Sequence, residues 1–312
     1  MQPITLLLPI RNGAIFVDDI MKSMISNCQP LDEIIVINDG STDESLNLLE
    51  NWASRESQVK IISTKGVGLV KSLNLGFSES RNNWVARFDA DDHYEINRLE
   101  KQRKFINENV SVIFADYSMY LDGKKFAGEI PSPVFHEATL LSLLYSQQTP
   151  HPVSLINKEK FVKSGGYLED EFPAEDLGLW VRMSLHGELI SCPENLFSYR
   201  LSKTSISAQR RQEALQKKNE IIKTVLPILK EKYSSRNSAL KNFNSLSGLP
   251  NEVVRKILYI RNLRLLKSMT GLKRDDSGKR VPNFYWYLFI HPTKVISFLF
   301  FQIIRKRFRA ES

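Results

Sequence analysis

The chain has 312 residues, of which 42% are hydrophobic and 25% are charged, which is the composition of a globular protein and excludes a disordered or collagen-like one. With two cysteines it cannot form a disulfide-rich secreted fold, so a reducing compartment is expected. The net charge of +8 is unevenly divided: residues 1–209 hold 20 Lys and Arg against 28 Asp and Glu (−8), and residues 210–312 hold 23 against 7 (+16). This asymmetry predicts an acidic catalytic part followed by a basic part that attaches to something anionic. The alternative is a Lys-rich, solvated helical surface.

Short apolar runs alternate with amphipathic stretches through the first third of the chain. Strands are expected at 4–10, 33–38, 59–63 and 84–88. Helices are expected at 18–26, from a cap at Thr42 or Asp43 to Trp52, at 69–80 and at 98–107. This alternation predicts βαβ units and an α/β fold with a mainly parallel sheet, in which ligands bind at the carboxyl ends of the strands.

The rest of the chain is less regular. Further strands are expected at 112–120, 125–130 and 153–156, and further helices at 136–146, 158–164 and 176–186. From about residue 209 the sequence is Lys-rich and helical, with expected breaks at Pro227 and at 248–250.

Residues 281–309 combine two apolar runs, 284–290 and 295–304, with a basic end at 305–307. Neither run reaches the roughly 20 residues that a membrane-spanning helix needs. Aromatic side chains beside clustered cations fit an element that lies at the surface of an anionic membrane. The alternative is a C-terminal core helix with a basic end.

Three carboxylates, Asp89, Asp91 and Asp92, follow the strand expected at 84–88. They repel one another and need a counter-charge. A hard divalent cation, Mg²⁺ or Mn²⁺, takes oxygen ligands and typically completes its coordination with phosphate oxygens and water. The cluster therefore predicts a metal that binds a nucleotide diphosphate or triphosphate. The alternative is an acidic first turn of the next helix.

Other polar residues follow expected strands or begin expected helices. Asp39 opens a turn where a carboxylate can bind a base or ribose, or simply form an Asx turn. Lys65 and Lys71 flank a glycine turn, where they can meet a diphosphate or be ordinary exposed lysines. Glu175 and Asp176 begin a helix, which suits a general base but also a simple N-cap.

Taken together, these segments resemble family 2 of the inverting glycosyltransferases, which have the GT-A fold, and the resemblance covers roughly residues 3–207. The match is closest to the bacterial branch that builds exopolysaccharide, capsule and O-antigen repeat units. The matching segments are LLPIRNG at 7–13, EIIVINDGSTDES at 33–45, GLVKSLNLG at 68–76, WVARFDADD at 84–92, RLEKQ at 98–102, HPVSLI at 151–156, GGY at 165–167, EDLGLWVRM at 175–183 and YRLSKTSIS at 199–207.

The resemblance implies a role for each matching position. Asp176 would be the catalytic base. Asp91, with Asp89, would hold the Mn²⁺ or Mg²⁺ ion. The implied acceptor residues are Glu175, Trp180 and His151. The implied nucleotide-sugar residues are Pro9, Arg11, Asn12, Asp39, Lys71, Asp89 and Ala90. Lys65 is added to this expected set because it flanks the glycine turn.

The sequence departs from the family at two places. Leu177 and Gly178 replace the aromatic and polar pair that often follows the Glu-Asp dipeptide. Ser202 stands where other branches carry a histidine after Tyr-Arg, so a histidine metal ligand is absent there.

The implied protein moves a sugar from a nucleotide-diphosphate sugar, such as a UDP-sugar, to a polyprenyl-diphosphate-linked saccharide. One base and no protein nucleophile imply a single displacement with inversion. The expected organisation is a GT-A domain at 1–208, with a nucleotide-sugar half at 1–116 and an acceptor half at 117–208, followed by a basic helical region at 209–312. The protein is expected to be cytoplasmic and to bind peripherally to the inner face of the bacterial plasma membrane.

Two other classes remain open at this point. A sugar nucleotidyltransferase also uses an Asp-x-Asp motif and an α/β sheet, although LLPIRNG is a poor triphosphate loop. The sequence pI of about 9.3 suggests a nucleic-acid-binding protein. The acidic first part argues against that class, and no nucleic-acid partner is expected.

Overall fold

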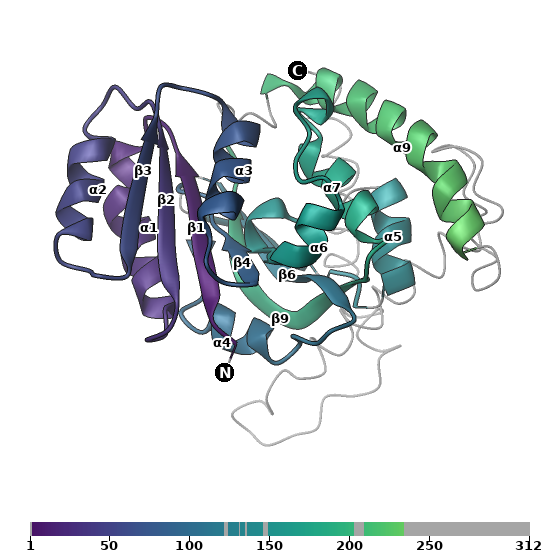
Figure 1. Ribbon diagram of the computed structural model, residues 1–312, viewed down its shortest axis with the longest axis horizontal. Helices are drawn as coiled ribbons and strands as arrows, with labels where there is room; N and C mark the ends of the chain where they lie inside the picture. Colours follow the sequence, from purple (N-terminus) through teal and green to yellow (C-terminus); the bar gives the residue numbers. More distant parts are fainter. Residues whose placement is uncertain are drawn as a thin grey trace, which may run out of the picture. The chain divides into compact units, whose positions relative to one another are not determined.

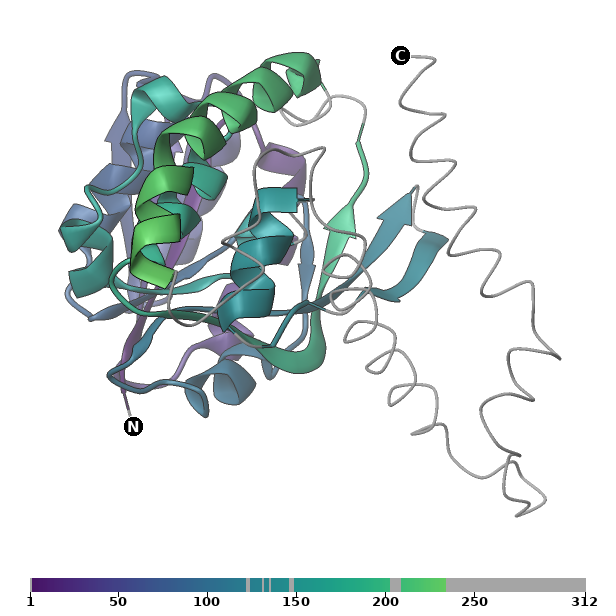
Figure 2. The same ribbon diagram turned by 90° about the vertical axis from the view of Figure 1, so that its right-hand side faces the viewer.

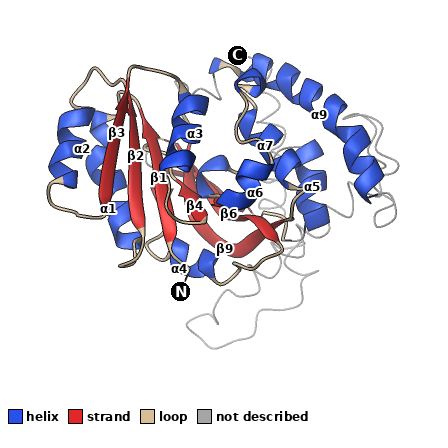
Figure 3. Ribbon diagram, viewed as in Figure 1, coloured by secondary structure: helices blue, strands red, loops and turns tan. Residues whose placement is uncertain are grey.

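The computed structural model describes residues 2–121, 124–130, 132–134, 136–145, 149–202 and 209–233. One sheet lies between two layers of helices (Figures 1 and 3). The predicted membrane-binding segment at 281–309 and the expected break at 248–250 lie outside the described residues.

The strands are β1 (Ile4–Ile10), β2 (Glu33–Asp39), β3 (Val59–Thr64), β4 (Trp84–Arg87), β5 (His93–Tyr94), β6 (Val110–Leu121), β7 (Lys124–Ile130), β8 (Leu155–Asn157) and β9 (Glu188–Arg200). The α-helices are α1 (Ala14–Asn27), α2 (Ser45–Ala53), α3 (Leu69–Glu79), α4 (Arg98–Arg103), α5 (His136–Tyr145), α6 (Lys158–Lys163), α7 (Glu175–Met183) and α9 (Arg211–Tyr233). Short 3₁₀ turns cover His151–Val153 and Glu169–Glu171.

The sheet has the strand order β3-β2-β1-β4-β8-β6-β9-β5, and β7 pairs with β6. The four strands β3, β2, β1 and β4 are all parallel, which confirms the predicted βαβ half. Beyond β4 the sheet is mixed, because β8 is antiparallel to both of its neighbours and β6 is parallel to β9. The parallel half therefore brings the ends of β1, β2 and β4 to one edge.

The predicted apolar strands are buried on both faces because successive side chains point to opposite helical layers. Leu7 and Ile35 pack with α3, α5, α7 and α9, whereas Leu6 and Ile34 pack with α1, α2 and α4. The two layers explain why these strands read as continuous hydrophobic runs.

Helix α9 continues through Pro227, so the predicted break there is wrong. Pro227 is exposed, and Ile222, Leu226 and Leu229 on the inner face of α9 are buried. They belong to the same core cluster as α7, against which α9 packs (Figures 1 and 2). This burial holds the helix together despite the missing backbone donor. No helix within the described ranges is both long and apolar enough to cross a bilayer.

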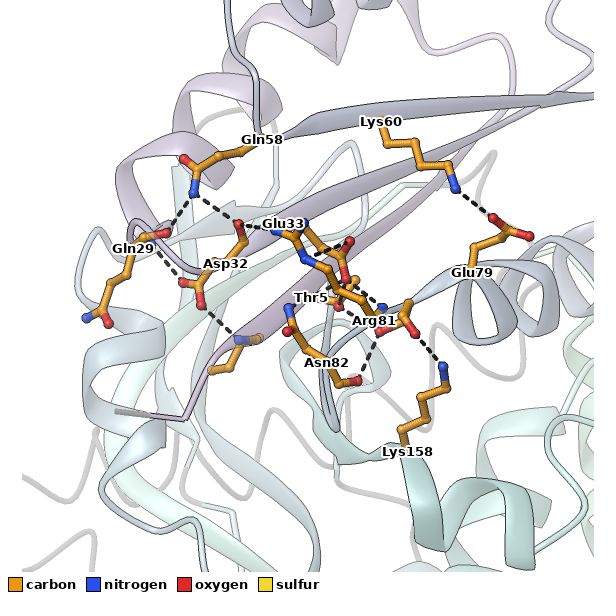
Figure 4. Close-up of polar contacts among 12 residues, drawn as sticks. Thr5, Gln29, Asp32, Glu33, Gln58, Lys60, Glu79, Arg81, Asn82 and Lys158 are labelled. Carbon is orange, nitrogen blue, oxygen red and sulfur yellow. Dashed lines mark hydrogen bonds and ion pairs between the residues drawn. The ribbon is translucent and has the colours of Figure 1, made fainter.

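A buried polar cluster fixes the opposite, amino-terminal edge of the sheet (Figure 4). Asp32 accepts hydrogen bonds from Ile4 N (2.8 Å) and Gln29 N (2.7 Å), and it forms a buried ion pair with Arg103. Glu33 accepts a hydrogen bond from Thr5 Oγ1 (2.5 Å). Since these contacts join β1 and β2 to α4, the cluster serves the fold rather than the site at the other edge.

Candidate functional site

The loops after β1 and β2 are tied together by side chains. Asn12 has a φ of +50°, and its Oδ1 accepts a hydrogen bond from Thr42 N (2.7 Å). Asp43 accepts hydrogen bonds from Ala14 N (3.0 Å) and Ser45 N (3.0 Å), the first residues of α1 and α2. The N-cap of α2 is Glu44, so the expected cap at Thr42 or Asp43 is wrong. The side-chain amide oxygen of Asn12 therefore links the loop after β1 to the loop after β2.

Asp39 ends β2 and supports the glycine turn that follows β3. Its Oδ1 accepts hydrogen bonds from Thr64 Oγ1 (2.6 Å) and Val67 N (2.7 Å). Its Oδ2 accepts a hydrogen bond from Gly68 N (2.9 Å), and Gly68 has a φ of +91°. Burial favours the neutral acid, but these hydrogen bonds outweigh it and lower the pKa of Asp39. The carboxylate is thus ionised and fixed under the turn.

The other predicted nucleotide residues of this half lie around the same turn. Arg11 is exposed, and its Nη1 would lie 3.5 Å from a Cβ added to Gly66. Lys65 is exposed, and Pro9 is buried within β1. Lys71 on α3 is 3.1 Å from the Glu169 carboxylate, which belongs to the segment before α7.

The acidic cluster lies directly after β4. Asp89 pairs with the buried Arg87 guanidinium (Oδ1 to Nη1, 2.6 Å). Asp92 Oδ1 accepts a hydrogen bond from Arg200 N (2.8 Å) at the end of β9. Ala90 between these residues is half-buried and would lie 4.0 Å from a Cβ added to Gly13.

Arg87 and Arg200 offset only part of the negative charge of the cluster. Burial, and then the charge of Asp89, raises the pKa of Asp91. The same two causes raise the pKa of Asp92 well above its ordinary value. Oxygen ligands with excess negative charge fit a hard divalent cation. Within the described ranges no three His, Cys, Asp or Glu side chains are grouped as a ligand set.

Glu175 and Asp176 are the first two residues of α7. Glu175 is buried, and burial together with the charge of Asp176 raises its pKa to about 8. The charges of Arg87 and Asp89 also act on Glu175, so α7 begins within electrostatic range of the end of β4. Asp176 is half-buried, and its Oδ1 accepts a hydrogen bond from Leu177 N (2.7 Å).

The raised pKa of Glu175 predicts a pH-dependent stability. Between about pH 4.5 and pH 8 the carboxyl is protonated in the folded state and ionised in the unfolded state, so the free energy of unfolding falls as pH rises. Glu175→Gln removes this loss, which is on the order of a few kcal/mol. We expect the variant to gain stability relative to the original chain between pH 5 and pH 8 in urea unfolding. If the free energies of unfolding of the variant and the original chain differed by the same amount at pH 5 and at pH 8, the raised pKa of Glu175 would be contradicted.

Aromatic residues lie beside the start of α7. The His151 Nε2 is 2.7 Å from the Tyr167 hydroxyl, and the His151 ring packs edge-on against Trp180. Burial, and then the charge of Arg87, holds the pKa of His151 well below its ordinary value, so its ring is neutral. Trp180 has no exposed surface, which places it behind His151 rather than at the surface of the site.

Sequence reasoning singled out neither Arg87 nor Tyr167, although both lie inside segments that it quoted. Arg87 precedes the acidic cluster, and Tyr167 follows Gly165-Gly166. Both residues could have been found from the sequence, because each is a basic or aromatic residue directly beside a motif. The individual roles implied for the site residues remain predictions.

Residues 5–162 match the model of glycosyl transferase family 2. The chain belongs to this family. An uncharacterized glycosyltransferase of Haemophilus influenzae is 28% identical over 268 residues, which cover 80% of this chain and 82% of that protein. The amylovoran biosynthesis glycosyltransferase AmsE of Erwinia amylovora is 26% identical, over 61% of this chain and 72% of its own length. The third relative is the UDP-Gal:α-D-GlcNAc-diphosphoundecaprenol β-1,3-galactosyltransferase of Escherichia coli, which is 25% identical over 57% of this chain and 66% of its own length.

Solved structures show the same fold. Staphylococcus aureus TarS (residues 1–349) in complex with UDP has a TM-score of 0.56 and 16% identity, over 89% of this chain and 85% of that one. The mannosyltransferase PcManGT of Pyrobaculum calidifontis, in complex with GDP-Man and Mn²⁺, has a TM-score of 0.56 and 16% identity, over 86% and 76% of the two chains. The predicted GT-A fold is thereby confirmed, and this family 2 protein is a glycosyltransferase with relatives in bacterial polysaccharide biosynthesis.

Proposed function

We propose that this glycosyltransferase is metal-dependent and inverting, and that it moves a sugar from a nucleotide-diphosphate sugar to a saccharide on a polyprenyl diphosphate. The observation that carries the proposal is the position of two carboxylate groups from different halves of the fold. The Asp89–Asp92 cluster follows β4, and the Glu175–Asp176 pair begins α7. The charge of Asp89 acts on Glu175, so the two groups lie within electrostatic range of each other. One group can hold the leaving diphosphate, and the other can activate the acceptor.

The nucleotide would lie along the edge formed by the ends of β1, β2 and β4. Asp39 fixes the glycine turn beside it, and Arg11 and Lys71 supply cations on the exposed side. Asp91, with Asp89, would hold a Mn²⁺ or Mg²⁺ ion, which supplies Lewis-acid neutralisation of charge on the departing diphosphate. Arg87 holds Asp89 in place through their ion pair.

Asp176 would act as the general base. It takes the proton of the acceptor hydroxyl while that oxygen forms a bond to the anomeric carbon, and the bond from that carbon to the diphosphate oxygen breaks. Attack from the face opposite the diphosphate inverts the anomeric configuration. Glu175, which is protonated at neutral pH because of its raised pKa, keeps a second negative charge away from Asp176.

The acceptor and the location are proposed from chemistry and from one relative. The Escherichia coli relative is named for transfer to a GlcNAc-diphosphoundecaprenol, which supports a lipid-linked saccharide as the acceptor class here. The net charge of +16 over residues 210–312 supports binding to an anionic bilayer, since juxtamembrane cations contribute about 1 kcal/mol each near such lipids. The protein would therefore work on the cytoplasmic face of the bacterial plasma membrane.

A donor screen tests the transferase proposal. The full chain is incubated with UDP-, GDP- and dTDP-sugars and Mn²⁺ or Mg²⁺, and release of the nucleoside diphosphate is measured with and without a GlcNAc-diphosphate carrying a short alkyl chain. We expect one donor class to be turned over and the acceptor to increase the release. Release of pyrophosphate from a sugar 1-phosphate and a nucleoside triphosphate would instead indicate a nucleotidyltransferase.

A further inference from the structure

The segment between α6 and α7, residues 164–174, is tied to α7 by one arginine. We call this segment the α6–α7 strap. Arg182 Nε donates to Ser164 O (2.9 Å), and Arg182 Nη2 donates to Gly166 O (2.6 Å). Arg182 Nη1 forms an ion pair with Glu171, whose side chain is only 12% exposed. A single guanidinium thus contacts residues in both halves of the strap.

Gly178 makes room for the Glu171 carboxylate. A Cβ added to Gly178 would lie 2.1 Å from Glu171 Oε2 and 2.2 Å from Glu171 Cδ, which no real pair of atoms allows. Glycine inside a helix is less favourable than alanine, so its presence here calls for such a reason. The Glu171 carboxylate therefore occupies the space that a side chain at position 178 would fill, and it packs directly on α7.

This contact lies beside the proposed catalytic pair. Gly178 is three residues after Glu175, so the two positions share one face of α7. Burial raises the pKa of Glu171 against the opposing effect of Arg182, and the charges of Asp170 and then Asp176 contribute in the same direction as burial. The charge of Asp176 thus reaches the carboxylate that seats the strap.

The strap is also held from two other elements. Glu169 pairs with Lys71 of α3 at 3.1 Å, and the Arg210 guanidinium lies 5.1 Å from the centre of the Phe172 ring. The strap therefore runs between the helix proposed to approach the nucleotide and the helix that carries the proposed base.

We propose that Glu171 is a positioning residue that seats the α6–α7 strap on Gly178 and Arg182, and that this contact makes Asp176 accessible to a saccharide rather than to water. The inference rests on the proposed function, because it assigns the base to Asp176. The proposal also explains why Gly178 replaces the larger residue that is frequent at this position in the family. The Glu171 side chain of the strap fills the space that a side chain of α7 would fill.

A double-mutant cycle tests the contact. Gly178→Ala pushes the Glu171 carboxylate away, so we expect the KM for GlcNAc-diphosphate-alkyl to rise roughly tenfold, within the ~10²-fold that a shift of ~1 Å can cost. The donor KM should stay within about twofold. Glu171→Ala should raise the acceptor KM as well. The double variant should be no worse than Glu171→Ala alone, because the clash has been removed.

Additive effects of the two substitutions, or equal losses in donor and acceptor KM, would overturn the inference. Glu171→Gln keeps the size of the side chain while weakening its pair with Arg182, so it serves as a second variant and should also raise the acceptor KM. Asp170→Asn is the matched control, since Asp170 is an exposed carboxylate of the same strap, and it should leave both KM values unchanged.

Donor hydrolysis by water separates this inference from the proposed function. If the original chain turns over no saccharide probe, the acceptor part of the proposed function fails. The strap is then judged by nucleotide-sugar hydrolysis, which we expect to rise at least about twofold in Gly178→Ala and Glu171→Ala and no further in the double variant. Unchanged or reduced hydrolysis in all three would overturn the positioning role.

Discussion

Asp176→Asn is expected to lower the turnover number by about 10²- to 10⁴-fold, the range that general-base catalysis typically contributes. The amide cannot take the proton of the acceptor hydroxyl, although it has nearly the shape of the carboxylate. Donor affinity should survive, because Asp176 lies on α7 and not among the strand ends that we assign to the nucleotide. Initial rates at saturating donor and acceptor, together with calorimetric titration of the donor nucleotide, measure the two effects separately.

A matched control for this variant is Asp19→Asn, since Asp19 is an exposed carboxylate on α1. Its turnover should equal that of the original chain. If Asp176→Asn lost donor affinity while keeping its turnover number, Asp176 would be a binding residue and the base would lie elsewhere.

Local sequence patterns were sufficient to predict the parallel half of the sheet. The runs at 4–10 and 33–38 are continuous and apolar because both of their faces are covered by helices, and they became β1 and β2 within one residue. The polar residues after β1, β2 and β4 then lie at one edge because these strands are parallel. Nothing beyond periodicity and the geometry of a parallel sheet was needed.

Elements whose stability comes from distant contacts were missed. The thirteen-residue strand β9 was not predicted, because Glu188–Arg200 contains a proline and several polar residues and shows no clear period. It forms by pairing with β6, far away in the sequence. The strand expected at 153–156 begins two residues later and ends one residue later as β8, after a 3₁₀ turn that begins at His151. Helix α4 ends at Arg103 instead of 107.

The chemistry of the candidate site was predicted at the level of residue types rather than contacts. A sequence shows that Asp39 follows a strand, but not that three hydrogen bonds hold its carboxylate under the glycine turn. A sequence also shows that Gly178 departs from the pattern of the family, but not that the Glu171 carboxylate fills the space beside Gly178. Such contacts join segments that are separated along the chain, so they require the fold.

We propose that the carboxylates after β4 hold a metal on which nucleotide binding and sugar transfer depend. Asp91→Asn removes one of the two proposed ligand carboxylates while leaving the Arg87–Asp89 ion pair in place. Changes to groups that merely support a metal ligand already cost about 10- to 100-fold, so loss of a ligand should cost at least as much. Asp19→Asn again serves as the control.

The most direct measurement is therefore donor turnover by the original chain and by Asp91→Asn, as a function of Mn²⁺ concentration and after treatment with EDTA. We predict that EDTA abolishes turnover by the original chain, that Mn²⁺ or Mg²⁺ restores it, and that Asp91→Asn is at least about 10²-fold slower at every metal concentration. Calorimetric titration should show that Mn²⁺ tightens nucleoside-diphosphate binding in the original chain and not in the variant. Full turnover in EDTA, or full turnover by Asp91→Asn, would show that Asp91 holds no metal that the reaction needs.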